Sequence, residues 1–230
     1  MSNKRLNQFK GELDAVQIAD GMNAASRNAK RLADDAAILL ENSRWPSAVS
    51  LAILSIEESG KLSILRRMAT ATDAKERKGI WREYRSHTQK NPMGIFIDHI
   101  RNGARKLGDF APIFDTDADH PYLLDQLKQL GFYSDCLGNA HWAEPATVID
   151  EPTARSMVVS AQALATEKII EAEEIELWIQ HVGPHLHGSQ ADAERALERW
   201  YSAMQQHGLA LGGTNAMSEF IHSGVGEGQT

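Results

Sequence analysis

The sequence predicts an all-α helical bundle with a small extended or hairpin insert near residues 132–146. Hydrophobic residues make up 42% of the chain and aromatic residues only 7%, and alanine and leucine dominate the apolar set, which favours packed helices over sheets. Apolar residues recur at three- and four-residue spacing through most of the chain. The stretch YSDCLGNAHWAEP breaks this pattern with aromatic residues and a Gly-Asn turn, which indicates the insert.

The first five helices are bounded by recognisable start and stop residues. Pro46 suits the first turn of the second helix, Asp73 is a suitable N-cap for the third, and the Asn91–Pro92 step disfavours helix and ends it. We expect helices over residues 12–42, 46–71, 74–88, 93–108 and 121–132. After the insert, one long helix should run from near Pro152 to the Gly183–Pro184 break, and a last helix should cover residues 190–206.

The chain reads as one domain, because no repeat, low-complexity block or linker divides it. We expect a flexible N-terminus over residues 1–10, one helical domain over 11–207, and a partly disordered tail over 208–230. The single cysteine, Cys136, excludes an intrachain disulfide. The N-terminus has no apolar signal region, and no apolar run approaches the roughly 20 residues that span a bilayer. The sequence therefore predicts a soluble cytoplasmic protein without a membrane partner.

Charge is distributed unevenly along this acidic chain, whose formal net charge is −7. Between Lys61 and Lys106 there are 12 Lys and Arg but only 4 Asp and Glu, which leaves 12 basic and 27 acidic residues for the rest of the chain. A basic zone of this kind is typical of a phosphate-binding surface. It is equally compatible with pairing against an acidic face of the same subunit or of a partner.

Arg82 and His87, inside the stretch WREYRSHTQKN, suggest cleavage of RNA. A histidine can take the proton from a 2′-hydroxyl or give one to the leaving oxygen, and an arginine can hold the charge that grows on the phosphoryl oxygens. This scheme requires no metal. The spacing alone carries little weight, since about 1.6 such pairs are expected by chance from the arginine and histidine content under uniform mixing.

Helix geometry restricts how this pair could work. On a continuous helix, five residues leave the two side chains about 140° apart, so Arg82 and His87 converge only if the helix ends between them or if two subunits supply them. Glu83 and His87, four residues apart, could touch. The alternative is that His87 is a surface histidine at a helix C-terminus, where the helix dipole favours it.

The stretch SIEESGK, residues 55–61, places Glu57 and Glu58 within one helical turn of Lys61. Two interpretations stay open: an exposed ion pair of little energetic weight, or a buried charged group that orients Arg82 or His87. Gly60 is unfavourable inside a helix, so we expect it to allow another backbone to approach closely.

Three histidines in HVGPHLH, residues 181–187, could bind zinc, but Gly183 and Pro184 break the helix that would align them. A metal-binding helical bundle is therefore only a third hypothesis. The sequence contains no phosphate-binding loop, dinucleotide fingerprint or nucleophile elbow. We expect no metal and no cofactor.

The order of the motifs resembles the AbiV-type abortive-infection proteins, a branch of the HEPN superfamily. The stretch GMNAASRNAKRLADDAAILLENSRWPSAVSLAILSIEESGKLSIL is similar to the start of that family, whose second helix ends in Glu-Glu-x-Gly-Lys. A His-x-x-Lys element follows at His87–Lys90. LKQLGFYSD then carries Tyr133 and Asp135, and Trp142 to Pro145 forms a Trp-x-x-Pro element before the next helix. The similarity spans roughly residues 20–180.

The resemblance implies an all-α HEPN-like bundle, usually dimeric, that acts in bacterial defence against phage. Many HEPN proteins are metal-independent ribonucleases with Arg-x4–6-His and a polar residue after the arginine, a pattern that Arg82, Glu83 and His87 match. We therefore expect a toxin-like endoribonuclease that acts on cellular or phage RNA. The alternative is a non-catalytic HEPN module that binds RNA, a phage protein or the translation machinery. A homodimer is expected, and a phage protein or an antitoxin is a further expected partner.

The expected site residues fall into three groups. The catalytic pair is Arg82 and His87, the phosphate clamp and the acid/base. The supporting residues are Glu57, Glu58, Lys61 and Glu83. The residues expected to bind RNA are Arg85, Lys90, Asn91, Arg101 and Arg105.

Overall fold

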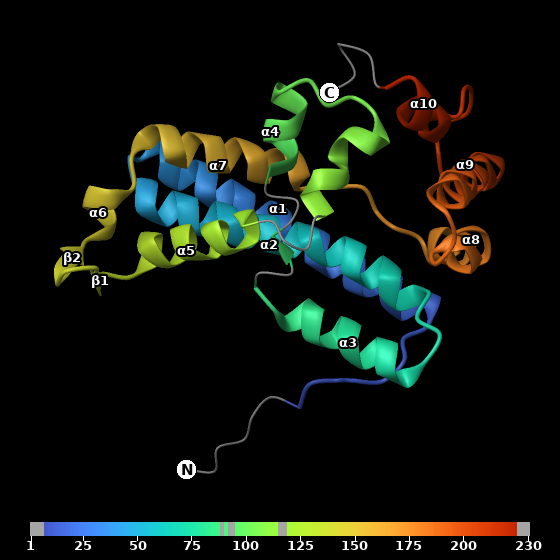
Figure 1. The fold of residues 1–230 in the computed structure, drawn as a ribbon, viewed down its shortest axis with the longest axis horizontal. Coiled ribbons are helices and arrows are strands. Elements are labelled where there is room, and N and C mark those ends of the chain that lie inside the picture. Colours follow the sequence, from blue (N-terminus) through green and yellow to red (C-terminus); the bar gives the residue numbers. More distant parts are fainter. Residues whose placement is uncertain (1–6, 88–89, 92–94, 115–118, 225–230) are drawn as a thin grey trace.

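The computed structural model describes residues 7–87, 90–91, 95–114 and 119–224. Within this part of the chain, helices dominate and the only sheet is one antiparallel hairpin (Figure 1). The predicted all-α bundle with a small insert is confirmed. No helix of the described residues is long and apolar enough to cross a membrane.

Two long helices form the centre: α1 (Ala15–Glu41) and α2 (Trp45–Ala69). Helix α1 begins at Asp14, whose carboxylate accepts a hydrogen bond from the Gln17 backbone N–H in a capping box. Buried alanines line the contact between the two helices, which lets their backbones come close; Ser55 of α2 donates to the Ala29 carbonyl of α1 at 2.7 Å. This pair is the rigid frame on which the other elements lie.

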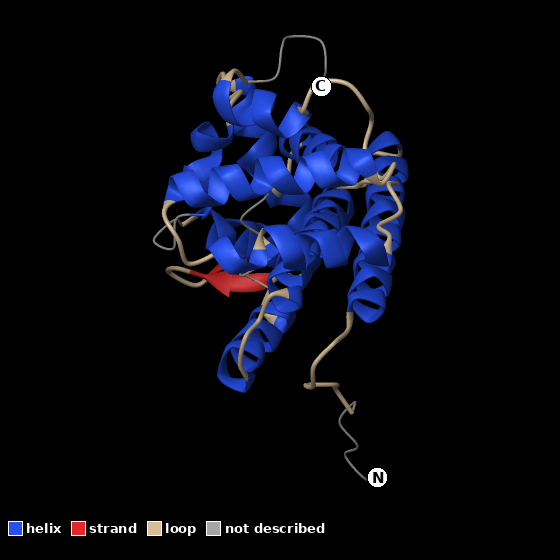
Figure 2. Ribbon diagram, turned by 90° about the vertical axis from the view of Figure 1, so that its right-hand side faces the viewer, coloured by secondary structure: helices blue, strands red, loops and turns tan. Residues whose placement is uncertain are grey.

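Helix α7 (Glu151–Leu164) packs across α1 and α2, and α5 (His120–Phe132) packs along α2. The hairpin β1 (Asp135–Leu137) and β2 (His141–Ala143) follows α5, and the short α6 (Pro145–Val148) leads into α7. Figure 1 shows the two strands at one end of the molecule, beyond α5 and α6, and Figure 2 shows them in red among the blue helices. Cys136 pairs with Trp142 in the register of the hairpin. The insert expected near residues 132–146 is therefore a hairpin.

Helix α3 (Ala74–Arg85) begins at Asp73, which caps the backbone N–H groups of Lys75 and Glu76 as predicted. The chain before α1 packs against it, since the Trp81 indole N–H donates to the Gly11 carbonyl at 3.0 Å. The single helix predicted over 93–108 is wrong: α4 covers only Phe96–Arg101, and a 3₁₀ helix, η3, covers Leu107–Phe114. Gly103, at φ 97°, reverses the chain between them.

The long helix predicted from near Pro152 to residue 182 is also wrong. It divides into α7 and α8 (Ala172–His181), which are separated by a non-helical segment. Side chains of α1 satisfy the backbone of this segment: Asn23 bonds both the N–H and the C=O of Ile170, and Ser26 donates to the Thr166 carbonyl. These hydrogen bonds replace those that a continuous helix would make.

The C-terminal elements form a unit beside the central pair: α8, the 3₁₀ turn η4 (Gly183–His185), α9 (Gln190–Gln206) and α10 (Ala216–His222). Helix α10 lies inside the segment expected to be a tail, and Asn215 caps it. Residues 225–230 and 1–6 lie outside the described residues. The guanidinium of Arg66 in α2 lies over the rings of both Trp178 and Trp200 and pairs with Glu174, which holds the unit to the bundle.

Candidate functional site

Helix α3 ends before the candidate histidine. Its last residue is Arg85, and Ser86 is extended at φ −80° and ψ 138°. The helix predicted to residue 88 is therefore three residues too long. The helix therefore ends between Arg82 and His87, and His87 leaves the helical path.

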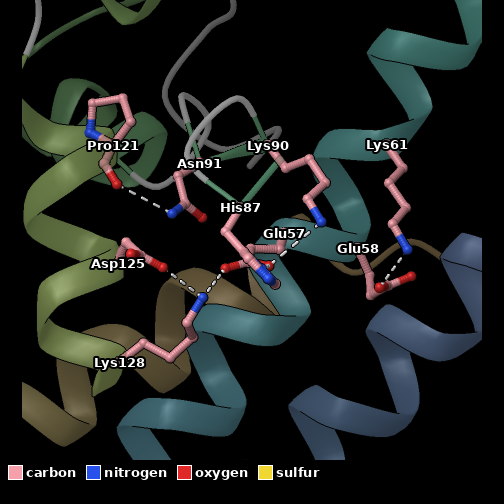
Figure 3. Close-up of polar contacts among 9 residues, drawn as sticks. All are labelled: Glu57, Glu58, Lys61, His87, Lys90, Asn91, Pro121, Asp125 and Lys128. Atoms are coloured by element: carbon pink, nitrogen blue, oxygen red, sulfur yellow. Dashed lines mark hydrogen bonds and ion pairs between the residues drawn. The ribbon is translucent and has the colours of Figure 1, made fainter. Parts of the chain in front are cut away.

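His87 reaches across to α2 and contacts Glu57, with 2.8 Å between Nδ1 and Oε2 (Figure 3). The two partners differ in exposure: 61% of the His87 side chain is exposed but only 2% of the Glu57 side chain. A carboxylate only accepts, so the Nδ1–H of His87 donates to it. The Nε2 lone pair is then left on an exposed ring.

Glu57 is the centre of a buried ionic cluster. Lys128 of α5 donates to its other oxygen, Oε1, at 2.5 Å and is paired with Asp125 at 2.8 Å. The ammonium of Lys90 lies 3.6 Å from Oε2, the oxygen that His87 also contacts. Side chains from α5 and from the segment after α3 therefore meet at one carboxylate of α2. We call Glu57, His87, Lys90, Asp125 and Lys128 the Glu57 cluster.

The backbone after His87 is held tightly against α2. A Cβ built on Gly60 would lie 2.1 Å from the Lys90 carbonyl oxygen, so only glycine fits there. The close approach predicted at Gly60 is confirmed. Asn91, fully buried, donates from Nδ2 to the Pro121 carbonyl at 3.2 Å and so ties this segment to the start of α5.

The two lysines of the cluster differ in their pKa. Burial lowers the pKa of Lys90, opposed by Glu57, and the charge of Lys61 lowers it further. For Lys128, burial acts in the same direction, but hydrogen bonds to Asp125 and Glu57 outweigh it and raise the pKa. Lys128 therefore remains the positive charge opposite Glu57, whereas Lys90 gives up its proton more readily than Lys128 does.

The family model for AbiV, of the HEPN type, matches residues 17–166, which is most of the chain and includes the whole Glu57 cluster. This chain belongs to the AbiV family. The AbiV-type HEPN resemblance seen in the motifs is therefore confirmed, and the chain is an abortive-infection HEPN protein. Searches of curated proteins and of solved structures gave no match.

In this AbiV protein, Arg82 lies apart from the cluster. It is exposed on the last turn of α3, beside a shallow pocket of about 320 Å³ with Gly79, Glu83 and Ser86, and it has no hydrogen bond or ion pair within the described residues. Glu83 pairs with Arg67 at 2.7 Å. The contact suggested between Glu83 and His87 is therefore not formed.

The other expected supporting and RNA-binding residues have local roles. Glu58 pairs with Lys61 at 2.6 Å, and both are mostly buried. The guanidinium of Arg85 bonds backbone carbonyls and stacks on Trp81, and that of Arg105 bonds the carbonyls of Ile100 and Ala104. Arg101 is half exposed beside Asp98.

Lys90 and Asn91 also have a different place from the one expected, because both are buried. They hold the segment after His87 and are not part of an exposed RNA-binding surface. Among the described residues, no group of three His, Cys, Asp or Glu side chains is close enough to hold a metal ion.

The sequence reasoning on this AbiV chain missed Asp125 and Lys128. A signal was present: Leu124, Lys128 and Gly131 share one face of a helix, so a lysine stands on a face that is otherwise suited to packing. A lysine on a packed helix face requires a buried carboxylate partner, and Glu57 supplies it.

Proposed function

We propose that this AbiV protein is a metal-independent endoribonuclease in which His87 is the acid/base. The observation that carries the proposal is the His87–Glu57 contact: a buried carboxylate holds Nδ1, and the exposed ring keeps Nε2 for substrate. A carboxylate in this position fixes the tautomer of the histidine and the orientation of its ring.

The reaction follows from these groups. His87 Nε2 accepts the proton of a ribose 2′-hydroxyl, the 2′-oxygen attacks the adjacent phosphorus, and the bond from phosphorus to the 5′-oxygen breaks. A proton returned to that oxygen completes the step, so the products are a 2′,3′-cyclic phosphate and a 5′-hydroxyl. Arg82 would hold the phosphoryl oxygens as their charge grows.

Two copies of the chain would complete the site. Arg82 is exposed and forms no hydrogen bond or ion pair with the described residues of the Glu57 cluster, and HEPN domains often dimerise and act on RNA. A symmetric dimer would bring two copies of the Arg82–His87 segment into one cleft. We expect Arg82→Ala and His87→Ala proteins, each inactive alone, to recover cleavage when mixed, because a mixed dimer contains one intact pair across the interface. No recovery by mixed dimers would contradict action across subunits.

His87→Ala tests the proposed function. We expect it to lower RNA cleavage by about 10²–10⁴-fold in the presence of a chelator, and to remove toxicity in cells, while the protein stays folded. His207→Ala is the matched control, because His207 also contacts a carboxylate, Glu173 at 2.6 Å, but at the surface of the C-terminal unit. A folded His87→Ala protein that cleaves at the wild-type rate would refute the proposal.

A second candidate is a binding module, and one observation favours it. Three aromatic side chains around the hairpin are exposed, Phe132 by 42%, Tyr133 by 62% and Trp142 by 69%, and such residues are frequent anchors of protein interfaces. On this hypothesis Trp142→Ala abolishes protection against phage, whereas His87→Ala does not. RNA binding that is insensitive to salt would exclude a phosphate-directed version.

A further inference from the structure

We infer that Lys128 is a positioning residue that fixes the orientation of the Glu57 carboxylate, the group that holds the Nδ1–H of His87. The inference rests on the proposed function for its catalytic meaning. Its structural content concerns only the described residues of the Glu57 cluster and is testable without RNA.

The two oxygens of Glu57 have separate partners. Oε1 accepts from Lys128 at 2.5 Å, and Oε2 lies 2.8 Å from His87 Nδ1 (Figure 3). Lys90 is farther from Oε2, at 3.6 Å. The shorter contact to Lys128 therefore decides which oxygen faces α5, and the remaining oxygen faces His87.

Lys128 is itself held in place from two directions. Asp125, one turn earlier in α5, pairs with its ammonium at 2.8 Å. Its backbone is fixed on α2, because the Ser50 hydroxyl donates to the Lys128 carbonyl at 3.1 Å and a Cβ on Gly131 would come within 2.3 Å of the Ser50 hydroxyl. The side chain is 4% exposed, so neither end can move without unpacking α5 from α2.

The charges agree with this role. The pKa of Lys128 is raised by its carboxylate partners despite burial, whereas burial lowers that of Lys90. Lys128 consequently remains a donor over the range in which a histidine titrates. An ammonium has three donors and no acceptor, so Lys128 can only donate to an oxygen of residue 57.

This geometry gives a sharp prediction for Glu57→Gln, which changes one oxygen to an NH₂ group. Lys128 can only donate, so it takes the amide oxygen and turns the NH₂ group toward His87. An NH₂ group can only donate, so Nδ1 must then accept and the proton of neutral His87 moves to Nε2. Glu57→Gln should therefore invert the tautomer and lower RNA cleavage by about 10²–10⁴-fold.

The tautomer is measured directly from the ¹⁵N shifts of the His87 ring in full-length protein, with the ring neutral. Wild type should carry the proton on Nδ1, and Glu57→Gln should carry it on Nε2. The double variant Glu57→Gln/Lys128→Met should lose this inversion, since the remaining donor, Lys90, lies on the side of the oxygen that faces His87. Glu151→Gln, the same change in an exposed ion pair with Arg155, is the control and should leave His87 unchanged.

The outcomes separate the two claims. An unchanged tautomer in folded Glu57→Gln, or an inversion that persists in the double variant, overturns the positioning role. If Glu57→Gln does not fold, Lys128→Met decides: faster solvent exchange of the His87 Nδ1–H supports the inference, and an unchanged exchange rate overturns it. If the tautomers behave as expected but wild type cleaves no RNA, the positioning role stands and the proposed function fails.

Discussion

At the scale of single residues, Glu57 carries more interactions than any other group of the site. It is 2% exposed and contacts Lys128, Lys90 and His87. A buried carboxylate is tolerated only when its oxygens are paired, and here both are. The pair with Lys128 makes this burial acceptable and leaves the other oxygen of Glu57 facing His87, the candidate acid/base.

Glu57→Ala should lower the free energy of unfolding by about 3–5 kcal/mol, because it removes the closest carboxylate partner of the buried Lys128. Glu58→Ala is the matched change one residue later, where the pair with Lys61 is 16–18% exposed, and should have a distinctly smaller effect. Urea denaturation measures both. Equal effects would show that Glu57 is not the organising charge.

Asp192 gives a prediction on pH. Its pKa is lowered to about 2, chiefly by the Ser189 hydroxyl at the N-cap of α9 and then by Arg195. A carboxyl group with a lowered folded-state pKa stabilises the fold above its ordinary value of 3.8, and that stabilisation is lost as the pH falls toward 2. The stability difference between wild type and Asp192→Asn should shrink over this window. A constant difference would contradict the pairing.

At the scale of elements, the decisive feature is where α3 stops and how the following segment crosses α2. Ser86 turns the chain out of the helix, and Gly60 lets the Lys90 carbonyl lie against α2. This crossing places His87 in contact with Glu57. The helical angle between Arg82 and His87 had already required such an end or a second subunit.

Gly60→Ala should displace the segment after His87, because its Cβ would lie 2.1 Å from the Lys90 carbonyl oxygen. We expect a loss of about 1–3 kcal/mol in stability together with reduced RNA cleavage. Gly79→Ala in α3 is the control: its Cβ would meet nothing within 4 Å, so it should stabilise the helix by about 0.5–1 kcal/mol. Similar effects of the two changes would refute the crossing.

Many of the helix and hairpin boundaries could be predicted from the sequence. Local signals such as Asp73, Pro46 and the hairpin turn marked real boundaries. Two of the failures have a common cause: Asn23 and Ser26 of α1 replace helical hydrogen bonds in the segment before α8, and Glu57 contacts His87 beyond the end of α3. Both effects come from residues distant in sequence, which periodicity does not register. The same holds for Lys128, whose partner is 71 residues away.

At the scale of the whole molecule, the AbiV match ends at residue 166, and α8, α9 and α10 lie beyond it. Arg66 joins this C-terminal unit to α2. Its guanidinium lies 5.2 Å from the Trp178 ring centre and 5.1 Å from that of Trp200, and pairs with the buried Glu174.

Arg66→Ala should therefore destabilise the protein by about 3–5 kcal/mol, because it leaves Glu174 buried without its main partner. Hydrogen exchange should accelerate in α8 and α9 first. Lys168→Ala removes the other, half-exposed partner of Glu174 and should change stability by less than about 1 kcal/mol. Hydrogen exchange that accelerates equally across α1 and α2 would show that Arg66 does not specifically hold α8 and α9 to α2.

The central claim is that a carboxylate-held His87 cleaves RNA without a metal. The chemistry of the product ends tests it most directly, measured by mass spectrometry after full-length protein is incubated with total RNA and a chelator. We expect 2′,3′-cyclic phosphate and 5′-hydroxyl ends with wild type and neither with His87→Ala. Ends with a 5′-phosphate, or equal cleavage by folded His87→Ala protein, would contradict it.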